Sequence, residues 1–566
     1  MRMKKIPIII ALSTIGLCTY AQNQKVTFNG AARSSIESNW LPQTDTTNID
    51  QATGGNTVVD LRLDIKPSDN IRLKTDLRFA NPMGGFWGQG ATIQLRHLSL
   101  KGVAGNIFKY RFGDIDVKMT PYTLYNYDGE LSKNEAEIFR FTRDINQEEN
   151  FNYGNFWHQQ GVDGAFRLGF DKFIQSADIS GFMVRNRSVE GNIIPDRLQG
   201  GTVVKCNINS GSYIGFNYIS LFDLPKTVSN DTKEKYQNSV STAIARFTVK
   251  DFILFGEAGA SVSAYTDTSA VALKDIAGNF FEAGITKSLL SKQLTLQASY
   301  RRVSDDFISA GAQTKRINYS ATPQVLPLVS EKSFTRSVGL FDLVKDQTIY
   351  NPSITPQLMP YDYSLNHVTP YGKATPNRKG ISVAIDYTDS AHVYASGLSV
   401  DLLKDVRGEG TEELRNYLLF NWNGMLAIHK LIDLDNTLQI TAGIQYAQSN
   451  RDGKSLVPDV NLHSIAYDAG VVLELAPRFD VLAGAKLLTV EGTEYASVRN
   501  EFNEITDYSV FSLNNKQTLY AGGIRYRFND NIALTLQGST YNVTHVQKSE
   551  YDFSIQQVYM IFSMKF

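Results

Sequence analysis

Hydrophobic and polar residues alternate with a period of two along most of this 566-residue chain. In 57–66 every second residue is Val, Leu or Ile, with charged residues between them, and 71–79 repeats the pattern. Alternate side chains of an extended chain point to opposite faces, so both segments are predicted strands with one apolar and one charged face. Because unpaired charges are too costly to bury in a dry core, we expect the charged faces to meet water and the apolar faces to meet another medium.

The last stretch, 551–566, has the longest apolar face. Five apolar residues occupy every second position up to the C-terminus: Val558, Met560, Phe562, Met564 and Phe566. A face of about nine residues suits a tilted strand that crosses a bilayer, although an edge or core strand of a soluble sandwich shows the same pattern. A final strand that ends in Phe after such alternation resembles the C-terminal insertion signal of Gram-negative outer-membrane barrels. The resemblance implies insertion by the barrel insertion machinery and a location in the bacterial outer membrane.

Short turns and longer connections alternate between the predicted strands. We count ten short turns, the first at 67–70, and eleven longer connections, which include 117–159, 304–378 and 492–515. This pattern predicts an all-β fold, a transmembrane antiparallel up-and-down β-barrel of about 22 strands within a range of 18–24. An even strand number places both termini on the side of the short turns, with the long loops external. Strands begin at about Val26, so we expect no plug domain before the barrel.

The N-terminus has the pattern of a secretory signal peptide. Three basic residues precede the apolar run 6–17, and small residues at Thr19 and Ala21 predict cleavage after residue 21. Removing three positive charges from a net charge of −1 leaves the predicted barrel, 22–566, at −4. Cys206 would be its only cysteine, which excludes a disulfide framework and a cysteine-rich metal site.

A basic strip on the polar faces of the early strands is the first candidate site. The residues predicted to line the lumen are Arg62, Lys66, Arg72, Lys74, Arg78, Lys109 and Arg111. With Asp60, Asp64 and Asp76 among them, this wall has a net charge of +4, which would favour anions in a low-dielectric pore. In the alternative interpretation, these charges pair across strands and only hydrate the lumen.

Two long loops are the other candidates. Loop 117–159 is similar in position and length to the loop of general porins that folds into the barrel and narrows it. Its acidic residues would then face the basic wall; the alternative is a solvated surface loop. Loop 304–378 combines seven prolines with aromatic residues, which indicates a lid or a surface for other envelope proteins rather than idle connection.

The predicted function is therefore an outer-membrane pore for passive or loop-gated passage of small polar or anionic solutes, in contact with outer-membrane lipid. The alternative is a non-conducting accessory barrel of a larger outer-membrane assembly or secretion complex. The seven histidines lack the spacing of a metal or catalytic motif, so we expect no enzyme, no metal and no cofactor. The near-neutral charge gives no indication of nucleic-acid binding.

Overall fold

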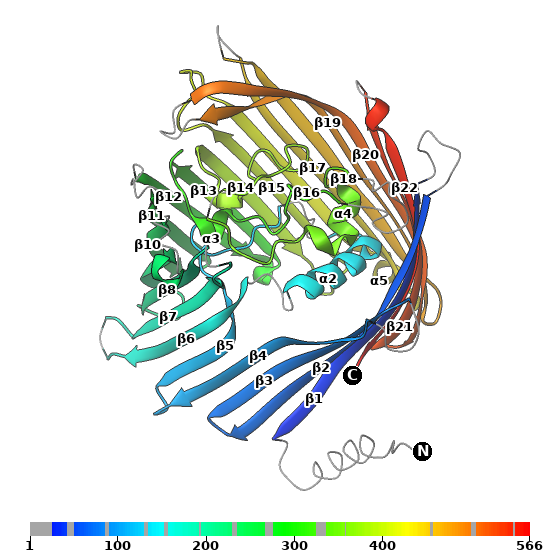
Figure 1. Ribbon diagram of the computed structural model, residues 1–566, viewed down its shortest axis with the longest axis horizontal. Helices are drawn as coiled ribbons and strands as arrows, with labels where there is room; N and C mark the ends of the chain where they lie inside the picture. Colours follow the sequence, from blue (N-terminus) through cyan, green and yellow to red (C-terminus); the bar gives the residue numbers. More distant parts are fainter. Residues whose placement is uncertain are drawn as a thin grey trace.

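Twenty-two antiparallel strands form one closed sheet in the computed structural model (Figure 1), in which β1 pairs with both β2 and β22. The structure describes residues 25–41, 50–84, 90–129, 134–151, 157–171, 173–191, 194–228, 235–266, 275–323, 335–356, 358–452, 457–499, 505–546 and 549–566. Each strand pairs with its neighbours in sequence, so the predicted up-and-down barrel of about 22 strands is confirmed. The signal peptide predicted at 1–21 lies outside the described residues.

The strands of the first half are β1 (Val26–Leu41), β2 (Asp50–Ser68), β3 (Ile71–Pro82), β4 (Thr92–Ala104), β5 (Phe108–Val117), β6 (Trp157–Gly169), β7 (Ser176–Arg187), β8 (Asp196–Asn207), β9 (Tyr213–Leu224), β10 (Lys235–Val249) and β11 (Phe252–Thr266). Those of the second half are β12 (Ile276–Leu289), β13 (Leu294–Val303), β14 (Arg378–Thr388), β15 (Tyr394–Lys404), β16 (Asn416–Ala427), β17 (Leu438–Arg451), β18 (Val460–Ala476), β19 (Phe479–Arg499), β20 (Ile505–Asn529), β21 (Ile532–His545) and β22 (Phe553–Lys565).

Short and long connections alternate in the predicted order. The start of β1 and the end of β22 therefore lie at the end of the barrel that carries the short turns. One predicted boundary is wrong: much of the proposed connection 492–515 is strand. At 21 and 25 residues, β19 and β20 far exceed the roughly ten residues that cross a bilayer. The halves of β19 and β20 that lie far from the short turns contain many polar residues because they extend beyond the membrane, and not because the sheet ends there.

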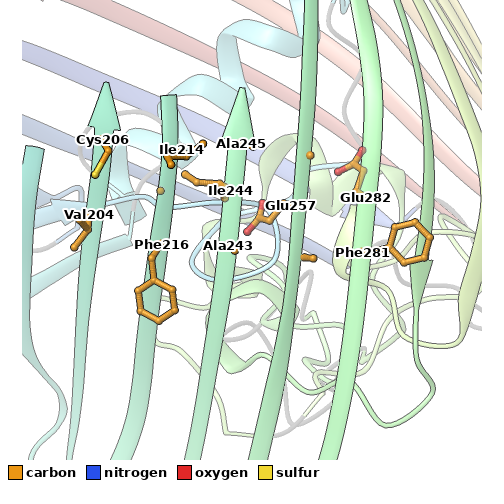
Figure 2. Close-up of a pocket in the computed structure, with 13 residues that line it drawn as sticks. Val204, Cys206, Ile214, Phe216, Ala243, Ile244, Ala245, Glu257, Phe281 and Glu282 are labelled. Carbon is orange, nitrogen blue, oxygen red and sulfur yellow. The ribbon is translucent and has the colours of Figure 1, made fainter. Parts of the chain in front are cut away.

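The outer face of the barrel is apolar. The outward side chains of Val558 and Met560 on β22, and of Phe566 directly after it, are 41, 39 and 51 % exposed. Over β8–β12 a hollow of about 630 Å³ forms at the register partners Ala243 and Ala258. Figure 2 shows Ala243 of this hollow between the larger side chains of Phe216 and Phe281. An apolar surface of this kind around a closed barrel faces lipid, because a soluble protein would have to cover it.

The inner face differs from the expectation that it would meet only water. Ile555, Tyr559 and Ile561 on the inner side of β22 are almost completely buried, although the part of the chain that the structure describes contains no second sheet to cover them. Ile555 and Tyr559 are covered because chain from the long connections β5–β6 and β13–β14 runs back into the lumen and packs on the wall. Ile555 belongs to one apolar cluster with Phe139 and Phe341, and the Lys345 Nζ lies 4.0 Å from the centroid of the Tyr559 ring.

These connections contain the helices seen inside the ring of strands in Figure 1: α2 (Glu137–Phe151), α3 (Ala310–Gln313) and α4 (Leu340–Lys345). A fourth, α5 (Ile428–Leu431), lies in the β16–β17 turn. The 3-10 helices are η1 (Pro225–Thr227), η2 (Leu290–Lys292), η3 (Gln347–Ile349), η4 (Gly372–Ala374) and η5 (Ser549–Tyr551). Among the described residues no helix has the length and apolarity needed to span a bilayer.

Candidate functional site

The first lumenal segment, described over 118–129 and 134–151, begins against the β11–β12 wall. The Thr120 hydroxyl donates to Glu257 of β11 at 2.6 Å, and the Tyr122 hydroxyl donates to Glu282 of β12 at 3.1 Å. Glu257 and Glu282 are register partners, so their side chains share the inner face of the barrel. Two carboxylates on one face of adjacent strands thus anchor the start of the segment.

The middle of this segment lies against a different wall. The backbone N–H of Ala136 donates to Asp468 of β18 at 3.3 Å, and Glu135 pairs with Lys486 of β19 at 2.6 Å. Glu137, at the start of α2, pairs with Arg525 of β20 at 2.9 Å. Within one segment, contacts therefore pass from β11–β12 to β18–β20, which means that the chain crosses the lumen.

Helix α2 ends at a cluster of arginines from the first four strands. Arg62 pairs with Glu148 at 2.7 Å, while Arg33 and Arg78 both pair with Glu149. Carboxylates at a helix C-terminus are opposed by the helix dipole. Four guanidinium groups offset this unfavourable effect of the dipole. Three of them form the ion pairs just described, and the fourth, that of Arg96, donates to the terminal carbonyls of Glu148 and Glu149 at 2.5 and 2.9 Å.

The second lumenal segment, described over 304–323, 335–356 and 358–377, starts on the β10–β12 wall. The Asn238 amide of β10 donates to the Ile308 carbonyl at 2.9 Å and accepts from the Ala310 N–H at 3.0 Å. Near the other end, Lys373 pairs with Glu282 at 2.6 Å. Glu282 therefore holds both lumenal segments.

Helix α4 carries the same segment to the opposite wall. The Leu340 N–H donates to Gln517 of β20 at 3.0 Å, and the Phe341 ring stacks on Tyr541 of β21 at 5.8 Å between centroids. Arg336 and Asp342 form a buried ion pair at 2.5 Å beside this contact. Asp342 also accepts from the Gly339 N–H at 2.8 Å, which satisfies a free donor at the helix start.

The two segments also contact each other. The Ser309 hydroxyl donates to the Tyr122 carbonyl at 2.8 Å, and Arg316 pairs with Asp128 at 3.0 Å. The Asn146 side chain donates to the Val344 carbonyl at 2.9 Å, which joins α2 to α4. They form one body that crosses the lumen between opposite walls.

Two apolar clusters stabilise this body. One joins α2 and α4 to strands β18–β22 through residues such as Phe139, Phe341 and Leu488, and the other joins Tyr122 and Phe307 to β9–β13. Hydrophobic burial therefore adds to the polar anchors. Burial also shifts ionisation within the segments: it lowers the pKa of His367 to about 4 and raises the pKa of Asp144 above its ordinary value.

The predicted lumen-wall residues divide into four arginines that form ion pairs and three lysines for which the structure describes no ion pair. Arg62 and Arg78 belong to the arginine cluster at α2, and Arg78 is also held by Asp60 at 2.6 Å. Arg72 pairs with Asp64, and Arg111 pairs with Asp163. Lys66, Lys74 and Lys109 have no carboxylate within 4.0 Å among the described residues.

Sequence reasoning missed Arg33, Arg96 and Lys101. In β4 the register shifts between Leu95 and His97, so even-numbered residues face inward before the shift and odd-numbered residues after it. Arg96 lies at the extra position, and Lys101 stands between Arg72 and Arg111 in the ladder of β3–β5. Since a bulge reverses the alternation, simple parity could not place Arg96 and Lys101.

No family model matches the chain, and no curated protein matches it. Among solved structures, OmpT of Vibrio cholerae is 9 % identical, with 96 % of this chain and 97 % of that chain covered and a TM-score of 0.26. The outer membrane channel DcaP of Acinetobacter baumannii is 9 % identical, with 96 % and 97 % covered and a TM-score of 0.28. The FrpB iron transporter of Neisseria meningitidis is 9 % identical, with 97 % and 83 % covered and a TM-score of 0.43.

Such distant likenesses concern architecture alone. The closed antiparallel sheet, its even strand number, its alternating short and long connections and its apolar outer face identify an outer-membrane β-barrel protein of the bacterial type.

Proposed function

We propose that this protein is a gated outer-membrane channel for small polar solutes, with a preference for anions, in which the two lumenal segments form the gate. The observation that carries the proposal is the path of these segments: each one crosses the lumen and is anchored to opposite walls. Passage through the barrel would require them to shift.

The wall does not depend on the second lumenal segment for its closure. Val303 at the end of β13 and Arg378 at the start of β14 are register partners, and the two strands pair along their whole length. The segment can therefore leave the lumen or change its conformation while β13 and β14 stay paired and the barrel wall stays closed. This arrangement supports a movable gate inside a fixed wall.

Anion preference is proposed from the wall near the short turns. Arg72, Lys101 and Arg111 follow one another across β3, β4 and β5, and Lys74 lies beside them. Asp64 and Asp163 offset part of this charge. The remaining positive strip would concentrate anions in a low-dielectric passage.

Replacing 306–375 with a short Gly-Ser linker would test the gate. Because Val303 and Arg378 are paired, the linker has only a short gap to span. We expect steady, larger conductance in planar bilayers. A matched control shortens 225–234, the long connection between β9 and β10, and should conduct like the unaltered protein.

The competing function is a silent accessory barrel. The large apolar cluster around α2 and α4 favours it, since such packing resists opening. Yet Phe341, Tyr350 and Tyr371, aromatic residues expected to form a partner surface, are buried within the barrel. If the folded deletion protein stays electrically silent, the gated channel is refuted and the accessory role is supported.

A further inference from the structure

Two histidines that are distant in sequence meet on the inner wall. His97 of β4 and His158 of β6 approach to 3.0 Å between Nδ1 and Nε2, although 61 residues separate them. Asp114 of β5 stands between these strands, and one potential ligand atom from each of the three residues lies within 4.8 Å of the others. His97 and Asp114 are buried, each 5 % exposed, and His158 is half-buried.

Local distortions of the sheet create this meeting point. The β4 bulge turns both Arg96 and His97 toward the lumen. In β5, Gly113 has a φ of +95°, and a Cβ there would lie 2.2 Å from the Leu98 carbonyl oxygen. The ladder between β4 and β5 stops at this glycine, and the Leu98 N–H donates instead to the Asp114 carboxylate at 2.6 Å. Only an irregular sheet brings the three side chains together.

Hydrogen bonds orient two of the three groups, His97 and Asp114, as metal ligands. The Ser99 hydroxyl lies 2.8 Å from His97 Nε2, so an Nε2–H that donates to it leaves the Nδ1 lone pair directed at His158. The Leu98 N–H donates to the Asp114 carboxylate and so fixes the orientation of that group. Outer-shell hydrogen bonds of this kind typically accompany histidine and carboxylate ligands, where they set the tautomer and the direction of the lone pair.

The neighbouring charges also favour a cation. Asp76 is the register partner of His97, and Asp116 is the register partner of His158. Arg62 lies 3.8 Å from Asp76, and Arg111 lies 3.9 Å from Asp116.

We propose that His97, His158 and Asp114 bind one divalent transition-metal ion of the Zn²⁺ class. Two imidazole nitrogens and one carboxylate oxygen form a donor set that Zn²⁺ accepts, with a fourth position left for water. The 3.0 Å separation of the two nitrogens is close to the roughly 3.3 Å edge of a tetrahedron built from Zn–N bonds of about 2.0 Å. In binding, His158 Nε2 gives up its hydrogen bond to His97 Nδ1 and carries its proton on Nδ1 instead. This inference does not depend on gating or solute passage.

The test uses the full chain in detergent micelles, stripped with EDTA and equilibrated with Zn²⁺ at pH 7.5. Mass spectrometry of the metal should find one ion per chain, and Co²⁺ should give the intense visible spectrum of a four-coordinate site. His97→Gln and His158→Gln should each weaken Zn²⁺ binding by more than about tenfold. His463→Gln is the matched control, since His463 lies on the distant strand β18 near Glu491 and should keep full binding.

A second measurement needs no variant. Zn²⁺ should protect the half-buried His158 of the unaltered protein from diethyl pyrocarbonate, whereas His463 should react equally with and without metal. Retained ions in the double variant His97→Gln/His158→Gln, or equal labelling of His158 with and without Zn²⁺, would show that the pair is only a hydrogen-bonded contact and would overturn the proposal.

Discussion

Acidification should loosen the second lumenal segment through His367. This imidazole is 2 % exposed and donates from Nδ1 to the Tyr363 carbonyl at 2.9 Å. Burial, followed by the nearby positive charge of Arg378 and by His463, lowers its pKa from 6.5 to about 4. The packed segment therefore binds fewer protons than the opened one between these pH values. The contribution of His367 to the stability of the packed segment is fully present above pH 6.5 and declines as the pH falls toward 4.

The size of the effect follows from the two pKa values. If the opened segment has the ordinary pKa, lowering the pH from 7.5 to 5 should favour opening by about 30-fold, or about 2 kcal/mol. Asp144 and Asp342 have raised pKa values because of burial, and their protonation acts in the opposite direction. The comparison with His367→Gln isolates the histidine, because both carboxyl groups remain in that variant.

Hydrogen exchange measured by mass spectrometry on peptides from 358–377 is the suitable assay. Intrinsic exchange rates cancel when the unaltered protein and His367→Gln are compared at the same pH. The ratio of their opening constants should rise about 30-fold between pH 7.5 and 5. An unchanged ratio would refute the argument that His367 is held neutral by burial.

Three further predictions concern the wall and its contacts. Gly113→Ala should lower the unfolding temperature seen by heat-modified gel mobility, because its Cβ would meet the Leu98 carbonyl, whereas Gly169→Ala, with open space around it, should not. Asp342→Asn should expose 335–356 to trypsin, because removing one partner of a buried ion pair costs about 3–5 kcal/mol of stability. Replacing Arg336 with Met in the same protein should restore part of the protection, because no buried charge is then left without a partner. Changing Arg72, Lys74 and Lys101 to Glu in the deletion barrel should move its reversal potential toward cations, and an unmoved potential would remove the anion preference.

Arg78 is unsuitable for that charge reversal, although it belongs to the predicted wall. It is 5 % exposed and is held by Asp60 and Glu149, so its replacement would disturb the anchoring of α2. Among the described residues Lys74 has no carboxylate within 4.0 Å, and Lys101 lies between Arg72 and Arg111. These positions report on the electric field in the lumen with less structural damage.

The barrel could be predicted because its signals are local. Alternation in 57–66 and 71–79 and turn residues such as those at 67–70 depend only on neighbours in the chain. The strand number and the order of short and long connections follow from them. The bulge at His97 was not predictable in this way, since it arises from the pairing of β4 with β3 and not from a run of residues.

The contents of the lumen could not be derived for a related reason. Glu137 and Arg525 are 388 residues apart, and nothing near either residue indicates the other. Nothing in the sequence around Ile555 and Tyr559 indicates that other segments cover them, because those segments are far away in the chain. The same distance hid the approach of His97 to His158.

The wide spacing of these contacts has a consequence for biogenesis. The first lumenal segment is made early, yet its partners Asp468 and Arg525 lie on strands that are synthesised near the end of translation. During export it must stay unpacked, with Ile138 and Phe139 uncovered, and would depend on periplasmic chaperones. Packing of the interior and joining of β1 to β22 then become linked final steps, so a defect in either one should leave the precursor open to periplasmic proteases.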